Sequence, residues 1–122
     1  MSKKYAMYVG RWQNWHSGHE WLIRQQLDKG KNAWVAIRNV DVDENNPKTA
    51  QQVLTELLQE PFFNNNADRI LISIIPDIES INYGRGVGYD VIYHEPPSDI
   101  ASISGTAIRN GEITPDGSVV NK

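Results

Sequence analysis

Short apolar runs alternate with amphipathic stretches along most of the chain. The runs at 5–9, 33–37 and 69–75 have the length of strands and end at glycine, polar residues or proline. Between them, the stretches at 17–29 and 49–63 carry apolar residues at helical spacing. Regular alternation of this kind predicts a parallel sheet whose strands are joined by helices.

Each predicted helix has a start signal. Ser17 and Glu20 have the spacing of a capping box. The second helix starts either at 46–47 or at Thr49, where Gln52 repeats that spacing. The residues expected to face the core from these helices are Leu22, Ile23, Leu27, Val53, Leu54, Leu57 and Leu58.

The remaining chain predicts two further strands, at Val87–Tyr93 and at 100–103, and a short helix from Ser104 to Gly111. We therefore expect a single α/β domain over residues 1–111, followed by a loose C-terminal tail at 112–122. The predicted architecture is a Rossmann-like, doubly wound, mostly parallel five-stranded sheet with helices on both faces. Ligands of such folds bind beyond the carboxyl ends of the strands.

Composition narrows the classes of function. The chain has 122 residues, of which 39% are hydrophobic and 22% are charged, as expected for one globular domain. The formal net charge of −3 without a basic block argues against nucleic acid as a partner. No cysteine is present, which excludes disulfides, thiolate zinc sites and a cysteine nucleophile. No apolar run approaches the roughly 20 residues that span a membrane, so we expect a cytoplasmic protein without a membrane partner.

The first segment with candidate chemistry is 10–19, with the sequence G-R-W-Q-N-W-H-S-G-H. Gly10 ends a strand, where a glycine lets the backbone approach a ligand closely. His16 and His19 flank the start of the predicted helix, and Gly18 leaves space for a base or a phosphate. The free amides and the dipole of that turn favour an anion. The alternatives are a purely structural histidine pair and a zinc site, which lacks evident further ligands.

The second segment is 103–109, with the sequence I-S-G-T-A-I-R. Ser104 is a candidate helix cap, and Gly105 and Thr106 follow in the first turn. Arg109 lies about one turn later, where its planar fork of donors can reach a phosphate. The alternative is an ordinary capped helix with a surface arginine.

Together the two segments resemble the HxGH nucleotidyltransferase superfamily. That superfamily includes nicotinamide mononucleotide and pantetheine-phosphate adenylyltransferases and glycerol-3-phosphate cytidylyltransferase. Residues 10–19 are similar to its G-R-F-Q-P-x-H-x-G-H segment, and residues 103–109 to its I-S-S-T-x-I-R segment. In this chain Trp12 replaces the usual phenylalanine, Asn14 the usual proline, and Gly105 a common second serine.

The resemblance implies transfer of a nucleoside monophosphate from a nucleoside triphosphate to a small phosphorylated acceptor, with release of pyrophosphate. It implies Mg2+ as the cofactor, held through the phosphates with no direct protein ligand. By position, His16, His19, Thr106 and Arg109 would be catalytic, with Arg109 neutralising the leaving pyrophosphate. The implied nucleotide-binding residues are Gly10, Arg11, Trp12, Gly18, Ser104 and Gly105.

Three further residues are candidates for binding the acceptor. Arg38 and Asp77 follow the second and third apolar runs, and Arg85 lies among three glycines. The alternatives are a solvated loop charge for Arg38 and a turn-forming role for Asp77. Trp12, which belongs to the first segment, is close enough to its histidines to contact the base of the nucleotide.

Several functions remain open at the level of sequence. We expect ATP rather than CTP, because the R-T-x-G-I-S-T-T pattern typical of cytidylyltransferases is absent. A CTP-using enzyme and a non-catalytic nucleotide-binding module are the alternatives. A class I aminoacyl-tRNA synthetase fragment shares the H-x-G-H signature, but the chain has no K-M-S-K-S-like loop. The acceptor is unassigned, and a homo-oligomer is possible.

Overall fold

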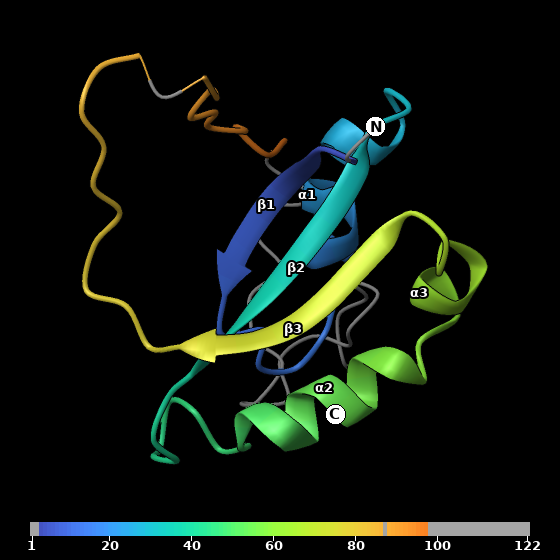
Figure 1. Cartoon of the computed structure of the whole chain (residues 1–122). Helices are drawn as coiled ribbons and strands as arrows, with labels where there is room; N and C mark the ends of the chain where they lie inside the picture. The colour runs from blue at the N-terminus through green and yellow to red at the C-terminus, as the bar shows by residue number, and fades with distance from the viewer. Residues whose placement is uncertain (1–2, 87, 98–122) are drawn as a thin grey trace.

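The computed structural model describes residues 3–86 and 88–97 (Figure 1). Its elements are β1 (Tyr5–Gly10), α1 (Ser17–Leu27), β2 (Asn32–Asn39), α2 (Ala50–Leu58), α3 (Pro61–Asn65) and β3 (Ile70–Pro76). These strands confirm the first three predicted strands. The predicted strand at 100–103, the helix from Ser104 and the tail at 112–122 lie outside the described residues.

The three strands form one parallel sheet in the order β1-β2-β3, so β2 has a neighbour on both sides. The register pairs Tyr8 with Val35 and Val35 with Ile72, which places these three side chains on the same face. Trp34 lies on the opposite face, where its Nε1 donates to Ser73 Oγ at 2.7 Å. The structure is therefore α/β with a small parallel sheet.

The helices and one face of the sheet enclose a single hydrophobic core. Both crossovers run in the same direction across the sheet, and right-handed crossovers then put α1 and α2 on the same side (Figure 1). In the described residues the helices thus cover one face, not both faces as predicted. The core residues are Tyr8, Trp12, Ile23, Leu27, Ala33, Val35, Ile37, Ala50, Val53, Leu57, Phe62 and Phe63.

The second helix begins where one of the two sequence signals placed it. Thr49 caps α2, because its side chain accepts from Gln52 N at 3.1 Å while Gln52 Oε1 accepts from Thr49 N at 2.8 Å. Val53 and Leu57 are buried as predicted. Leu58 was expected in the core but is 55% exposed, because it is the last residue of α2 and lines an open pocket with Ile70 and Ile72.

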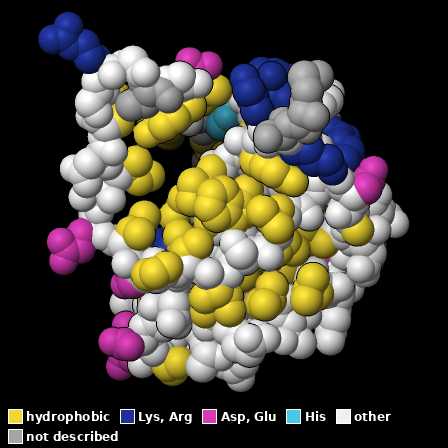
Figure 2. All heavy atoms as spheres, in the orientation of Figure 1, with side chains coloured by type: hydrophobic (Ala, Val, Ile, Leu, Met, Phe, Trp, Pro, Cys, Tyr) yellow, Lys and Arg dark blue, Asp and Glu magenta, His cyan; other side chains and the backbone are white. Residues whose placement is uncertain are grey.

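The opposite face of the sheet has no helix over it among the described residues. Figure 2 shows hydrophobic side chains gathered across the strands on this face. Met7 on β1 is 46% exposed and Leu71 on β3 is 45% exposed. Neither helix α1 nor any other described helix is long and apolar enough to cross a membrane.

The predicted fourth strand is wrong for the residues that the structure describes. Between 77 and 97 these residues form neither helix nor strand, and the segment runs away from the sheet (yellow to orange in Figure 1). Val91 and Ile92 are both exposed. The apolar run has the composition of a strand, but a strand is stable only when its backbone pairs with a neighbour and its side chains are buried.

Removal of the α2 cap tests this account of the fold. We expect Thr49→Ala to lower the free energy of unfolding by about 1 kcal/mol, because the Gln52 amide at the helix start loses its acceptor, Thr49 Oγ1. Thr55→Ala in the exposed middle of α2 is the control and should change stability little. Urea denaturation measures both variants, and equal losses would contradict the capping role.

Candidate functional site

A six-residue loop, 11–16, connects the carboxyl end of β1 to the start of α1. Two of its residues adopt left-handed backbone conformations, Trp12 with φ of 54° and Asn14 with φ of 56°. Such conformations are uncommon outside glycine and persist only where the surrounding structure holds them. The loop is therefore held in a specific shape, and that shape determines how α1 begins.

Two histidines form the cap of α1. His16 is the N-cap residue, with extended backbone, and its Nδ1 accepts from Gly18 N at 3.0 Å. His19 reaches back, and its Nδ1 accepts from His16 N at 3.3 Å. This reciprocal pair replaces the expected Ser17 and Glu20 capping box, because the loop delivers the extended residue one position earlier.

The capping bonds determine which ring nitrogen of each histidine carries the proton. A nitrogen that accepts a hydrogen bond is unprotonated, so in the neutral imidazoles of His16 and His19 the proton lies on Nε2. No described residue forms a hydrogen bond with either Nε2. The two rings stack with centroids 3.7 Å apart and planes inclined by 19°. The helix start therefore presents two adjacent N–H donors.

Both imidazoles are neutral at physiological pH. Burial, followed by the neighbouring charge of a protonated His16, lowers the pKa of His19 to about 3. Burial also lowers the pKa of His16. The site thus offers neutral hydrogen-bond donors and the partial positive charge of a helix N-terminus, instead of two imidazolium ions.

Trp12 supports the site from within the core. It is buried, its Nε1 donates to Ala36 O at 3.0 Å, and its ring meets His19 edge-on with centroids 5.0 Å apart. The expectation that Trp12 contacts a base is therefore wrong in this structure. Gly10 has a matching explanation, since a Cβ there would lie 3.2 Å from Trp12 Cε2. The glycine makes room for an indole, whether or not a ligand also approaches.

Trp15 connects the histidines to the third helix. Its ring centroid lies 5.4 Å from that of His19, 5.9 Å from that of Phe62 in a stacked pair, and 4.8 Å from that of Phe63. Trp15 therefore has a packing role in this structure. The orientation of His19 therefore depends on α3 as well as on α1.

Two polar residues that the sequence reasoning did not select tie the loop to the segment after β2. Gln13 donates from Nε2 to Lys48 O at 2.9 Å and accepts from Lys48 N at 3.0 Å. Asn46 Oδ1 accepts from Arg11 Nη1 at 3.1 Å, which holds the guanidinium of this predicted nucleotide-binding residue. Gln13 and Asn46 are both buried, so these bonds are partly shielded from water.

Arg38 and Asp77 meet at the same edge of the sheet. Arg38 belongs to β2 and Asp77 directly follows β3. Arg38 Nη2 lies 2.7 Å from Asp77 Oδ1, Nε donates to the same oxygen at 2.9 Å, and Nη2 donates to Ile78 O at 3.3 Å. Arg85 is exposed in the irregular segment, and no described interaction joins it to this pair.

The second predicted segment, with Ser104, Gly105, Thr106 and Arg109, lies outside the described residues. Within 3–86 and 88–97, no group of three or more histidine, aspartate or glutamate side chains could hold a metal ion. Two buried polar atoms near the start of α1, Asn14 Nδ2 and Ser17 Oγ, have no hydrogen-bond partner among the residues that the structure describes. Comparisons of the chain with protein-family models, curated proteins and solved structures gave no match.

The loop geometry predicts that proline is not tolerated at Asn14. The resembled family has proline at this position, but proline fixes φ near −65° whereas Asn14 has φ of 56°. We expect Asn14→Pro to lower the free energy of unfolding by about 3 kcal/mol. Asn14→Gly, which accepts positive φ, is the control and should stay near the wild-type stability in thermal denaturation. Equal stability of all three proteins would contradict the loop shape.

Burial of the histidines predicts a stability that depends on pH. In the unfolded chain His19 binds a proton below about pH 6.5, whereas in the folded chain it stays neutral down to about pH 3. The contribution of His19 to the free energy of unfolding is therefore fully present above pH 6.5. It decreases as the pH falls toward 3, by up to about 1.4 kcal/mol per pH unit. Urea denaturation near pH 7.5 and near pH 5 should show a larger loss for wild type than for His19→Gln, which lacks the imidazole but keeps an acceptor for His16 N. A smaller loss for wild type would refute the assignment.

Proposed function

We propose that the chain is a nucleotidyltransferase that transfers AMP from ATP to a small phosphorylated acceptor and releases pyrophosphate. The observation that supports this most is the pair of Nε2–H donors from His16 and His19 at the start of α1. The pair stands where the loop after β1 meets a helix N-terminus, which is a place that favours phosphate. The resemblance of residues 10–19 to the HxGH segment supports the same assignment.

The proposed chemistry requires positioning and charge stabilisation. As the acceptor oxygen attacks the α-phosphorus, negative charge grows on the phosphate oxygens, and donors already in place stabilise it without reorganising. The capping bonds keep the Nε2 atoms of His16 and His19 in place before the nucleotide arrives. Mg2+ would neutralise the phosphates that carry it, so no protein ligand is needed for the metal.

The acceptor would bind at the same carboxyl edge of the sheet, beside β2 and β3 instead of β1. Arg38 supplies a guanidinium there, and Asp77 holds it through one carboxylate oxygen. An acceptor phosphate would form a bidentate pair with Arg38 in exchange for part of the contact with Asp77. Arg85 is the weaker candidate of the three predicted acceptor-binding residues.

The complete enzyme we propose is larger than the part of the fold described above. Ser104, Gly105, Thr106 and Arg109 would bind the β- and γ-phosphates beside the two histidines. A larger sheet remains part of the proposal, with the strand predicted at 100–103 beside β1, whose Tyr5 and Met7 are exposed. The reaction would take place in the cytoplasm, where ATP and phosphorylated acceptors are available.

Nucleotide binding and turnover test this proposal separately. With Mg2+, ATP should raise the melting temperature of the wild type more than CTP does, since a ligand at 100 times its Kd adds about 2.7 kcal/mol. Pyrophosphate release should then appear with one member of an acceptor panel of nicotinamide mononucleotide, a phosphosugar, phosphopantetheine and sulfate. We expect His16→Asn to lower kcat by about 10²–10³, because it keeps an acceptor for the helix cap but removes the Nε2 donor.

The matched control is Ser17→Ala. Ser17 is adjacent to His16, and its Oγ makes no hydrogen bond in the described part of the chain, so this variant should retain the wild-type rate. Absence of binding to either nucleotide would contradict the proposal. Binding without pyrophosphate release from any acceptor would indicate a non-catalytic module, and a larger stabilisation by CTP would indicate a cytidylyltransferase.

A further inference from the structure

The outer edge of β3 has no strand beside it among the described residues. In a parallel ladder, alternate residues direct both backbone polar groups to the same neighbour. Arg69 O accepts from Ala33 N at 2.9 Å, so Arg69 and every second residue after it face β2. Ile72 and Ile74 therefore direct their N–H and C=O groups outward, away from the sheet.

Only Pro76, at the end of β3, blunts this edge. Its sequence, I-L-I-S-I-I-P, contains no charged residue and no glycine, and its side chains are rich in β-branched isoleucine. Edge strands of monomeric proteins are normally blunted by charges, bulges or a covering element. Here Leu71 is 45% exposed on one face of the strand and Ile74 is 36% exposed on the other. The edge has the chemistry of a strand that pairs on both sides.

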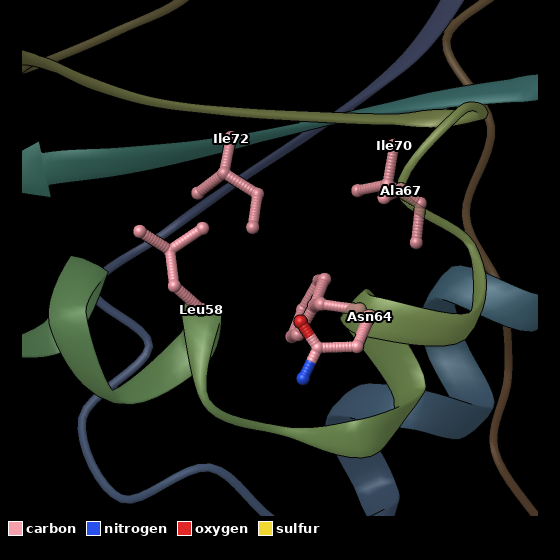
Figure 3. Close-up of a pocket in the computed structure, with 6 residues that line it drawn as sticks. Leu58, Asn64, Ala67, Ile70 and Ile72 are labelled. Carbon is pink, nitrogen blue, oxygen red and sulfur yellow. The ribbon is translucent and has the colours of Figure 1, made fainter.

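An apolar groove continues from this edge on the helix side. It has a volume of about 180 Å³ and is lined by Leu58, Phe63, Asn64, Ala67, Ile70 and Ile72. Figure 3 shows Ile70 and Ile72 projecting from β3 toward Leu58 and Asn64 across the groove. A hydrophobic side chain that arrives beside β3 on this face would fill the groove.

We propose that β3 is a dimer interface, in which it pairs antiparallel with β3 of a second copy about a twofold axis at Ser73. This inference goes beyond the proposed function and does not depend on it. In this register Ile72 lies opposite the partner subunit's Ile74, and the two exchange both backbone hydrogen bonds. Directly opposed residues share a face, so the partner's Ile74 enters the groove beside Ile72.

Charge complementarity selects this register. It brings Arg69, which precedes the strand, opposite the partner's Asp77, which follows it, and the twofold axis repeats the pair. The guanidinium of Arg69 forms no ion pair within the described residues; its Nη2 donates to Leu27 O and Lys31 O, so Nε and Nη1 would meet the partner's carboxylate. Asp77 uses Oδ1 for its bonds to Arg38 and Ile78, which leaves Oδ2 for the partner.

The end of the strand also fits this register. Pro76 has no N–H and falls opposite the partner's Ile70, so one bond of that pair cannot form. The N–H of Ile70 already donates to Asn66 O at 3.0 Å within its own chain, so the second bond of that pair does not form either, and no outward N–H is left without a partner. A twofold contact of this kind is closed, because each copy uses its only β3 edge and no further copy can add.

Sedimentation equilibrium and amide hydrogen exchange test the proposal on the full chain. We expect a dimer at tens of micromolar, and an Ile74→Lys variant that is monomeric with an unchanged far-UV circular dichroism spectrum. Met7→Lys is the matched control, since it places the same charge on a comparably exposed strand residue of β1, and it should remain dimeric. In the wild type, exchange of the Ile72 and Ile74 amides should slow as the protein concentration rises.

Two outcomes overturn the proposal. A wild type that is monomeric up to hundreds of micromolar, with concentration-independent exchange at Ile72 and Ile74, removes the interface. A dimer that survives Ile74→Lys places the contact elsewhere. If Ile74→Lys unfolds, the exchange measurement on the wild type still decides. The double swap Arg69→Asp with Asp77→Arg should dimerise better than either single variant, and failure to do so rejects the register.

Discussion

Two hydrogen bonds at the start of α1 determine the character of the candidate site. Because Nδ1 of His16 and Nδ1 of His19 each accept from a backbone amide, neither ring can rotate or take the other neutral tautomer without leaving a helix amide unpaired. The same bonds separate the two functions of each ring. One nitrogen completes the helix, and the other is left as a donor for a ligand.

The loop before the helix explains why the histidines can serve as caps. Trp12 anchors the loop to Ala36 O in the central strand, and Gln13 closes it against Lys48 through both groups of a backbone peptide. These contacts compensate for the left-handed backbone at Trp12 and Asn14. The position of the site is thus determined by the most buried strand of the fold, so substitutions that loosen β2 should affect ligand binding and stability together.

Local pattern was sufficient to predict the three strands and both main helices, because each has apolar residues at the spacing that buries one face of a strand or a helix. It was not sufficient for the cap of α1, since Ser17 and Glu20 match the usual signature and nothing local reveals the left-handed turn that moves the cap to His16. Gln13 was missed because its partner is a backbone peptide 35 residues away. The one available signal was that the resembled segment itself carries glutamine there.

Among the described residues, the strand prediction at Val87–Tyr93 was wrong for a related reason. β propensity reports which side chains a segment can bury, while strand pairing depends on which sheet edge the segment reaches. The sheet has two outer edges at which a further strand could pair. β1 offers an edge beside the candidate site, whereas the uncharged β3 offers one away from the histidines. Asp77 is the residue that connects the two regions, with Oδ1 on Arg38 and Oδ2 toward a second copy. Pairing at β3 would therefore hold Asp77 from both sides, and this would restrict how far Arg38 can turn toward an acceptor phosphate.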